Sequence, residues 1–450
     1  MSDTEIQPIE RSADSSVAGE DSRDSSGSAG FTALGRVSTE ILCEMFRSTL
    51  PHKRQYHGVT HNTPPWRIAL VSKRWRECAL GDALLWTTVE VSCLGLQLSE
   101  CYPLAALKTQ ILRSKNAPLD VTFIIVGRSC AHNSSLLEVL IRESHRWEGL
   151  DLGGTMDPEI LLVLARIRGR LQLLKYLEIQ WSPNVLGIRD IFGVAPQLQR
   201  VVLTQNRHDD EAEVLPILSV PWSQITHLHA WDFIGVSRVL CQTKILVECT
   251  LQNGVVLPGT PIVLLPRLRR LSVSDNKFLE FLETPNLEYL FIDFGWRLDN
   301  FDTENSVPYV PAFLRRSQCQ LKGLTLYNCC LANLNPILRV VPSLLHLYVH
   351  TNGSTTHFQD LPNIDGSLES IHFTFDVASC HSESLYNFIV GRRRTLKLLS
   401  IWADSRSPLS PDVKERLLAL RSDDLDVLLD DATRWSGPLA KLTKDMEPMY

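Results

Sequence analysis

The amino-acid sequence predicts an α/β repeat fold, in which a small helical module precedes a curved solenoid built on one parallel sheet. Three observations predict it. The 450 residues exceed the length at which one compact core normally stops growing. The chain is 44% hydrophobic, enough for a large core. A short strand pattern, apolar at positions one, four and six, recurs along residues 174–401, whereas residues 38–79 follow helical spacing.

The recurring strand pattern appears ten times, and successive copies begin 19 to 34 residues apart. Leucine-rich repeats recur every 20–29 residues or so, with a similar arrangement of apolar positions. We therefore expect a leucine-rich-repeat-like solenoid over residues 117–430, with about ten parallel strands and a weaker early copy at Trp147. The ten copies begin at Leu174, Leu198, Ile225, Leu246, Leu268, Leu287, Leu321, Leu344, Leu368 and Leu396.

Two further positions fit this repeat. Position nine, where a polar or thiol side chain satisfies the turn backbone, is occupied by Asn206, Asn276, Cys329 and Asn352. Prolines, which stop a preceding helix, stand two residues before four of the strands, at Pro196, Pro266, Pro285 and Pro342. Ten ordered copies with these additions predict a repeat architecture more strongly than any single match.

The helical module begins where Ser38 or Thr39 can cap a helix, with Glu40 in its first turn. Its apolar stripe consists of Ile41, Leu42, Met45 and Phe46. After a polar loop at 52–65, the pattern predicts a second helix from Trp66 to Ala79, ended by Gly81, and then a strand over 87–91. The second helix places Ile68, Val71, Trp75 and Cys78 on one face.

These two helices resemble the F-box, in the form abundant in mushroom-forming (basidiomycete) fungi. The segments that carry the resemblance are VSTEILCEMF (37–46) and RIALVSKRWRECALGDALLW (67–86), and it covers residues 34–91. Val71, Trp75, Ala79 and Trp86 stand at family positions, but Val37-Ser38 replaces the usual Leu-Pro. The repeat region also resembles the C-terminal halves of those fungal proteins, including PWSQITHL (221–228) and LPRLRRLSV (265–273).

The resemblance implies a substrate-recognition subunit of an SCF-type (Skp-cullin-F-box) E3 ubiquitin ligase. The F-box would dock to a Skp-family adaptor, which joins it to cullin and RING subunits, while the repeats capture a protein substrate. Carried over by position, the adaptor-binding residues are Ile41, Leu42, Met45, Phe46, Val71 and Trp75. An alternative is that these side chains only pack the helices on each other, because a small module needs its own core.

Strand parity predicts a second site. Positions three, five and seven of each strand face the concave side of such a solenoid, where exposed aromatic side chains are typical of recognition surfaces. The candidate substrate-binding residues are Tyr289, Phe291, Tyr327, His346, Tyr348, His350 and Trp402. The same parity places His227, His229, Trp231, Asp293 and His372 on this side. An alternative is that loops or the C-terminal segment cover the face.

No motif of an enzyme is present: the sequence lacks a phosphate loop, GxSxG, HExxH and GxGxxG. His346 and His350 have helical metal-ligand spacing but lie on an expected strand without a third ligand, so no metal or cofactor is expected. The alternative to the ligase receptor is a non-catalytic repeat scaffold with a degenerate F-box. An unrecognised enzyme is the weakest reading, because no nucleophile, base and orienter appear together.

Charge and cysteine content predict the kind of partner and the cellular compartment. Of the net charge of −6, residues 1–30 carry −5 (two basic and seven acidic residues), so the body is almost neutral and nucleic acid is not an expected partner. No apolar run reaches the length of a membrane span. Eleven cysteines without a CxxC pair are typical of reduced thiols in the cytoplasm or nucleus. We expect a disordered Ser-rich acidic tail at 1–30, a linker helix within 92–116, and a C-terminal tail at 436–450.

Overall fold

The computed structural model describes thirteen stretches of the chain. They are residues 37–50, 64–93, 103–125, 131–154, 158–181, 190–205, 218–294, 309–329, 334–351, 368–375, 382–391, 395–403 and 411–431. The two tails expected at 1–30 and 436–450, and nearly all of the expected loop at 52–65, lie outside these residues.

One parallel sheet runs through the described residues, with fourteen strands in the same order as the chain. Its strands are β1 (Thr88–Cys93), β2 (Leu119–Ile125), β3 (Trp147–Gly154), β4 (Tyr176–Trp181), β5 (Arg200–Gln205), β6 (His227–Trp231), β7 (Glu248–Gln252), β9 (Arg270–Val273), β11 (Tyr289–Asp293), β12 (Gly323–Tyr327), β13 (His346–Thr351), β14 (Ser370–Phe375), β15 (Leu398–Ala403) and β16 (Asp426–Asp431). The ten strands expected from the repeat are all present, as β4–β7, β9 and β11–β15. The expected parallel sheet is therefore confirmed.

The sheet has more strands than the expected ten. The early copy expected at Trp147 is β3, which pairs with β2. The strand β1 was assigned from sequence to the helical module, but it pairs with β2 and is the first strand of the sheet. The last strand, β16, was missed, because Asp424 stands where the pattern requires an apolar residue at position one. Val427 and Leu425 are nevertheless buried there.

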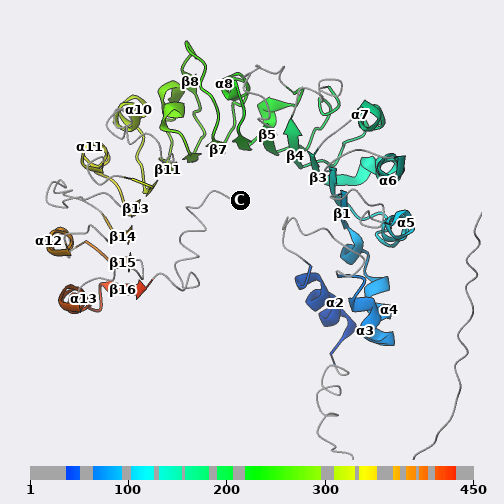
Figure 1. Ribbon diagram of the computed structural model, residues 1–450, viewed down its shortest axis with the longest axis horizontal. Helices are drawn as coiled ribbons and strands as arrows, with labels where there is room; N and C mark the ends of the chain where they lie inside the picture. Colours follow the sequence, from blue (N-terminus) through cyan, green and yellow to red (C-terminus); the bar gives the residue numbers. More distant parts are fainter. Residues whose placement is uncertain are drawn as a thin grey trace, which may run out of the picture.

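The sheet curves into an arc, with its strands along the inner edge and the helices along the outer edge (Figure 1). The outer helices are α5 (Leu104–Arg113), α6 (Ala131–Arg142), α7 (Pro158–Leu164), α8 (Val236–Leu240), α10 (Tyr309–Ser317), α11 (Leu334–Leu338), α12 (Ser382–Val390) and α13 (Pro411–Leu418). Short 3-10 turns complete several crossings: η3 (Ser144–Arg146), η4 (Ala165–Ile167), η6 (Trp222–Gln224) and η7 (Asn276–Phe281). A separate two-stranded sheet pairs β8 (Val263–Leu264) with β10 (Leu282–Glu283).

The core lies between the sheet and the outer helices. Because side chains alternate along a strand, positions four and six of each repeat all point to this layer. In the central register Leu290, Leu324 and Leu347 stand on adjacent strands and are at most 2% exposed. Each fully buried aliphatic side chain stabilises the fold by about 1.5–3 kcal/mol relative to exposure. Asn276 and Cys329, two of the position-nine residues, are buried as well.

The helical module consists of α2 (Thr39–Ser48), α3 (Ile68–Val71), α4 (Lys73–Gly81) and the 3-10 turn η1 (Ala83–Trp86). The expectation of one helix from 66 to 79 was wrong. Ser72 is extended (φ −156°, ψ 166°), and its hydroxyl accepts the amide of Trp75, which starts α4 as a separate helix. A serine side chain satisfies a helix N-terminus better than it fits a helix interior, so the chain breaks here.

The linker helix expected within 92–116 is α5, which lies against the helical module. None of the helices that the structure describes is long and apolar enough to cross a membrane. Six cysteines within the described part of the chain are free thiols: Cys43, Cys78, Cys241, Cys249, Cys319 and Cys329.

Candidate functional site

The six side chains expected to bind an adaptor divide into two groups. Leu42 (0% exposed) and Phe46 (2%) are buried, and the Phe46 ring packs 4.8 Å from that of half-buried Trp75. The expectation that Leu42 and Phe46 face a partner is therefore corrected: they form the core of the module. Ile41 (56% exposed), Met45 (43%) and Val71 (56%) remain on the surface.

The exposed pair on α2 lines a groove. Ile41 and Met45 are four residues apart, so they lie on one face of α2, and this face forms one wall of an open groove against α4. The opposite wall includes Arg74, Glu77 and Cys78. A surface with apolar side chains flanked by charged ones has the composition of a protein-binding patch.

Sequence reasoning missed Leu70, the most exposed apolar residue of this module. Leu70, next to Val71, is 74% exposed. The break at Ser72 changes the direction of the chain, so that α3 turns these two apolar side chains outward while Ile68 stays buried. The only signal in the sequence was Ser72 itself, a helix-capping residue in the middle of an expected helix.

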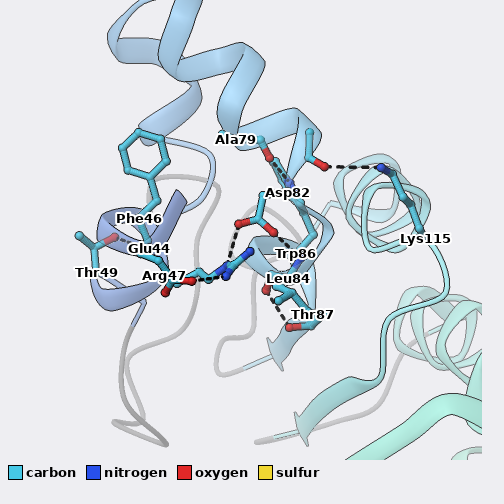
Figure 2. A network of polar contacts seen from close by, with 11 residues as sticks. Glu44, Phe46, Arg47, Thr49, Ala79, Asp82, Leu84, Trp86, Thr87 and Lys115 are labelled. Carbon is cyan, nitrogen blue, oxygen red and sulfur yellow. Dashed lines mark hydrogen bonds and ion pairs between the residues drawn. The ribbon is translucent and has the colours of Figure 1, made fainter. Parts of the chain in front are cut away.

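A polar network fixes α2 against η1, as Figure 2 shows. Arg47 on α2 donates from Nε to Oδ2 of Asp82 (2.8 Å) and from Nη1 to Glu44 (2.6 Å). The other carboxylate oxygen of Asp82 accepts the amide of Leu84 at 3.1 Å and so caps η1. Because Asp82 is only 8% exposed, this ion pair holds the two elements in one orientation.

The start of α2 is also well defined. Ser38 caps the helix by accepting the amide of Ile41 at 3.4 Å, and Arg74 donates a hydrogen bond to the carbonyl of Val37. Backbone and Ser38 hydrogen bonds lower the pKa of Glu40, so this exposed carboxylate stays charged beside the positive end of the helix. Val37-Ser38 therefore gives α2 a stable beginning without a proline.

The second candidate site is the inner face of β11–β15. The parallel register places its side chains in rows across the sheet, and the burial of β13 alternates strictly, with His346, Tyr348 and His350 half-buried on this face. All seven side chains expected here are half-buried, so within the described part of the chain no segment covers them completely. They are Tyr289, Phe291, Tyr327, His346, Tyr348, His350 and Trp402.

Ring contacts and hydrogen bonds organise these residues. Tyr327 stacks on His350 with ring centroids 4.1 Å apart, and Tyr348 stacks on His372 at 6.1 Å. The indole Nε1 of Trp402 donates to the Ser400 hydroxyl at 2.7 Å, which lays the ring over its own strand. Rigid aromatic groups lose little entropy on binding, a property of recognition surfaces.

Two further contacts fix polar groups on the same face. The Tyr348 hydroxyl lies 3.2 Å from the Thr374 hydroxyl, and Nδ1 of His346 lies 2.9 Å from the Ser370 hydroxyl. Asp293, at the end of β11, accepts the Asn328 amide at 2.8 Å. Each of these groups already has a protein partner, so the face presents ordered rather than freely rotating polar atoms.

His346 and His372 on this face are neutral at pH 7. Burial lowers the pKa of His372 to about 4, with a smaller contribution from His346. Burial also lowers the pKa of His346, although the nearby Glu369 opposes the shift. Among the described concave positions of β11–β15, Asp293 is the one acidic side chain, and none is lysine or arginine. The face is thus aromatic, polar and almost uncharged.

We expect acid to destabilise the protein through His372. Its pKa is lower in the folded chain than the ordinary value of 6.5, so the unfolded chain binds the extra proton between pH 6.5 and about 4. Stability is therefore present above pH 6.5 and lost as pH falls toward 4, by at most about 3 kcal/mol. Urea denaturation at several pH values measures it, and His372→Gln should flatten the slope. An unchanged slope in the variant would assign the acid sensitivity to other groups.

The middle of the inner face differs in character. On β6, Trp231 is 41% exposed and stacks beside His229, with centroids 6.4 Å apart. Charged groups lie elsewhere on this part of the face: Glu248 lies 3.9 Å from His227, and Arg270 lies over the Tyr289 ring at 5.6 Å. Basic side chains at the concave positions therefore end at β9, where Arg270 contacts Tyr289 of β11.

Comparison with known proteins gives few matches. No family model matches the chain, and no curated protein does either. One solved structure that matches is a protein from Bacteroides fragilis, determined in a structural genomics programme. It is 12% identical, with a TM-score of 0.23, and the match covers 77% of this chain and 75% of that one.

Proposed function

We propose that the chain is the substrate-recognition subunit of an SCF-type E3 ubiquitin ligase. In this proposal α2–α4 and η1 are an F-box that docks to a Skp-family adaptor, and the sheet with its outer helices is a leucine-rich-repeat-like solenoid that captures a protein substrate. Cullin and RING subunits join through the adaptor. The protein itself performs no catalytic step and needs no cofactor.

One observation carries the adaptor part of the proposal. The module has a complete core of its own around Leu42, Phe46 and Trp86, yet it keeps large apolar side chains on its surface. These are Ile41, Met45, Leu70, Val71, Leu80 and Leu84. Apolar groups that the core does not need, concentrated on a module of this size, are typical of a protein-docking surface.

The substrate part rests on the inner face. The strands β11–β15, which carry these aromatic side chains, lie far along the arc from α2–α4 (Figure 1). Separate surfaces at the two ends of one curved body suit a receptor that holds the adaptor and the substrate at the same time. The near absence of charge on this part of the face favours a protein segment over nucleic acid.

A second candidate function is a non-catalytic scaffold with a degenerate F-box. The observation that favours it is Val37-Ser38, which stands where F-box proteins usually have Leu-Pro. Because Ser38 caps α2, this departure leaves the helix intact and changes only what the surface offers. The scaffold predicts a folded module that does not bind the adaptor.

Binding to a purified Skp-family adaptor tests the proposal, measured by titration calorimetry with the full chain. We expect Ile41→Asp and Met45→Asp to weaken binding at least about tenfold, because each places a charge in a desolvated apolar contact. Circular dichroism should show an unchanged fold, since both side chains are exposed.

The matched control is Leu162→Asp on α7, an equally apolar side chain that is 73% exposed but lies outside the module. It should bind the adaptor like the unmodified chain. Phe46→Ala should lose binding only together with the fold of the module, because Phe46 is core. Undetectable binding by the unmodified chain, with the module folded, would favour the scaffold instead.

A further inference from the structure

On the inner face of β11–β15, the exposure of the side chains varies regularly along the middle row, which is position five of each repeat. Phe291 on β11 and Tyr348 on β13 are half-buried and project from the face, whereas Thr325 between them on β12 is 6% exposed. The row continues with His372 on β14, which is also 6% exposed. High and low positions therefore alternate from strand to strand.

Trp402 completes the pattern on β15. The middle row there is Ser400, which is fully buried, but the Trp402 indole donates to the Ser400 hydroxyl and so lies toward that row. Along the middle row, aromatic rings thus stand on β11 and β13, at Phe291 and Tyr348, and Trp402 lies toward the same row on β15. We name these three side chains the aromatic ladder.

The spacing of the aromatic ladder is set by the sheet. Neighbouring strands lie about 4.8 Å apart, so alternate strands are about 9.6 Å apart at the backbone. The strands lie along the inner edge of the arc (Figure 1), so side chains that point toward its inside converge slightly. A polyproline II helix repeats every three residues, with a rise of about 9.3 Å per turn.

Other peptide conformations match less well. In an α-helix, residues one turn apart are separated by about 5.4 Å, which requires anchors on every strand, and seven residues span about 10.5 Å, more than the ladder allows. In an extended strand, side chains on one face recur about every 6.7 Å, which is not a multiple of the strand spacing. The low positions at Thr325 and His372 would leave a helix without contacts there.

The chemistry of the face agrees with the spacing. Polyproline II segments bind grooves lined with aromatic rings, because their preformed backbone loses little entropy and the flat pyrrolidine rings pack on aromatic faces. Their backbone carbonyls make no internal hydrogen bonds and accept them from outside. Tyr289 and Tyr348 bring hydroxyl groups to the same face, and His346 and His372 there are neutral.

We infer that the aromatic ladder binds a proline-rich segment of a partner protein in the polyproline II conformation. The segment crosses β11 to β15, and its residues at every third position rest on successive ladder rings. This inference rests on the proposed function only in that the partner is then the substrate of the ligase. The binding itself requires no adaptor.

The test uses the full chain and a fluorescein-labelled oligoproline peptide, followed by fluorescence anisotropy. A Gly-Ser peptide and an Ala-rich helical peptide of equal length are the comparison probes. We expect saturable binding of oligoproline alone. Phe291→Ser and Tyr348→Ser should each weaken it at least about tenfold, since each removes an aromatic anchor. Added salt should change the affinity little, because the face is almost uncharged.

Trp231→Ser is the matched control, because Trp231 is an exposed aromatic residue of the same sheet, on β6, outside the ladder. Trp231→Ser should leave the affinity for oligoproline unchanged. All three variants should keep the fold of the unmodified chain. Three results would overturn the inference: no saturable oligoproline binding, equal or tighter binding of either comparison peptide, or an equal loss in Trp231→Ser. Because no adaptor is present, a failure here is separate from a failure of the proposed ligase function.

Discussion

Replacing Trp86 with alanine is expected to lower the free energy of unfolding by about 4 kcal/mol, the cost of truncating a fully buried tryptophan. Trp86 is 0% exposed and its Nε1 donates to the Ala79 carbonyl at 2.7 Å (Figure 2). Its ring meets Trp66 edge-on, with centroids 4.9 Å apart. The Arg113 guanidinium of α5 lies 4.4 Å from the same ring, so Trp86 joins the helical module to the first helix beside the sheet.

Urea denaturation followed by circular dichroism measures this cost. Trp86→Phe is the control, because it keeps an aromatic ring for Trp66 and Arg113 and removes the indole N–H. We expect it to cost about 1–2 kcal/mol, mainly from the unpaired Ala79 carbonyl and the smaller ring. A loss below about 1 kcal/mol in Trp86→Ala would show that the module and the sheet body do not depend on this residue.

Gly154→Ala is expected to be the most damaging conservative change in the sheet. Gly154 ends β3 with φ +85°, a conformation that side chains disfavour, and it pairs with Ile125 on β2. A Cβ atom there would lie 1.7 Å from the Ile125 carbonyl oxygen. Because that neighbour is backbone, β2 and β3 would have to separate locally. Overpacking and strain together predict a loss of about 3 kcal/mol or more.

Gly169→Ala separates the two causes. Gly169 has φ +72°, but a Cβ atom there would meet nothing within 4 Å. This variant should therefore show the cost of the backbone conformation alone, about 1 kcal/mol. Thermal or urea denaturation of both variants gives the comparison. Equal losses would mean that the contact with Ile125 relaxes without cost and that only the backbone angle matters.

The sheet was predictable because its signal is repeated. One apolar pattern marks each strand, and parity then assigns every other side chain to the inner face, which is why Tyr289, Phe291 and Tyr348 are where the pattern placed them. The strand β16 escaped because Asp424 interrupts the pattern at its first position. A prediction from the local pattern fails at such a polar residue, although the folded sheet accommodates it.

The candidate sites were predictable only in part. A stripe such as Ile41, Leu42, Met45 and Phe46 covers a wide arc of a helix, and sequence cannot tell which edge packs inward. The tertiary contact with α4 decides this, burying Leu42 and Phe46 and leaving Ile41 and Met45 outside. The alternating relief of the aromatic ladder likewise depends on side-chain orientation, above all that of Trp402 over Ser400.

The order of the strands has a consequence for folding during translation. In the sheet each strand pairs with the one before it in the chain, apart from the detour of β8 and β10 to a small sheet of their own. As the chain leaves the ribosome, each new strand can therefore pair at once with the strand before it, which has already been synthesised. It does not depend on later residues for this pairing. Growth by addition to a finished edge suits a repeat architecture, where each unit contacts only its neighbours. It also limits how long any one edge waits unpaired during synthesis, which is when a β-rich chain is most exposed to wrong partners.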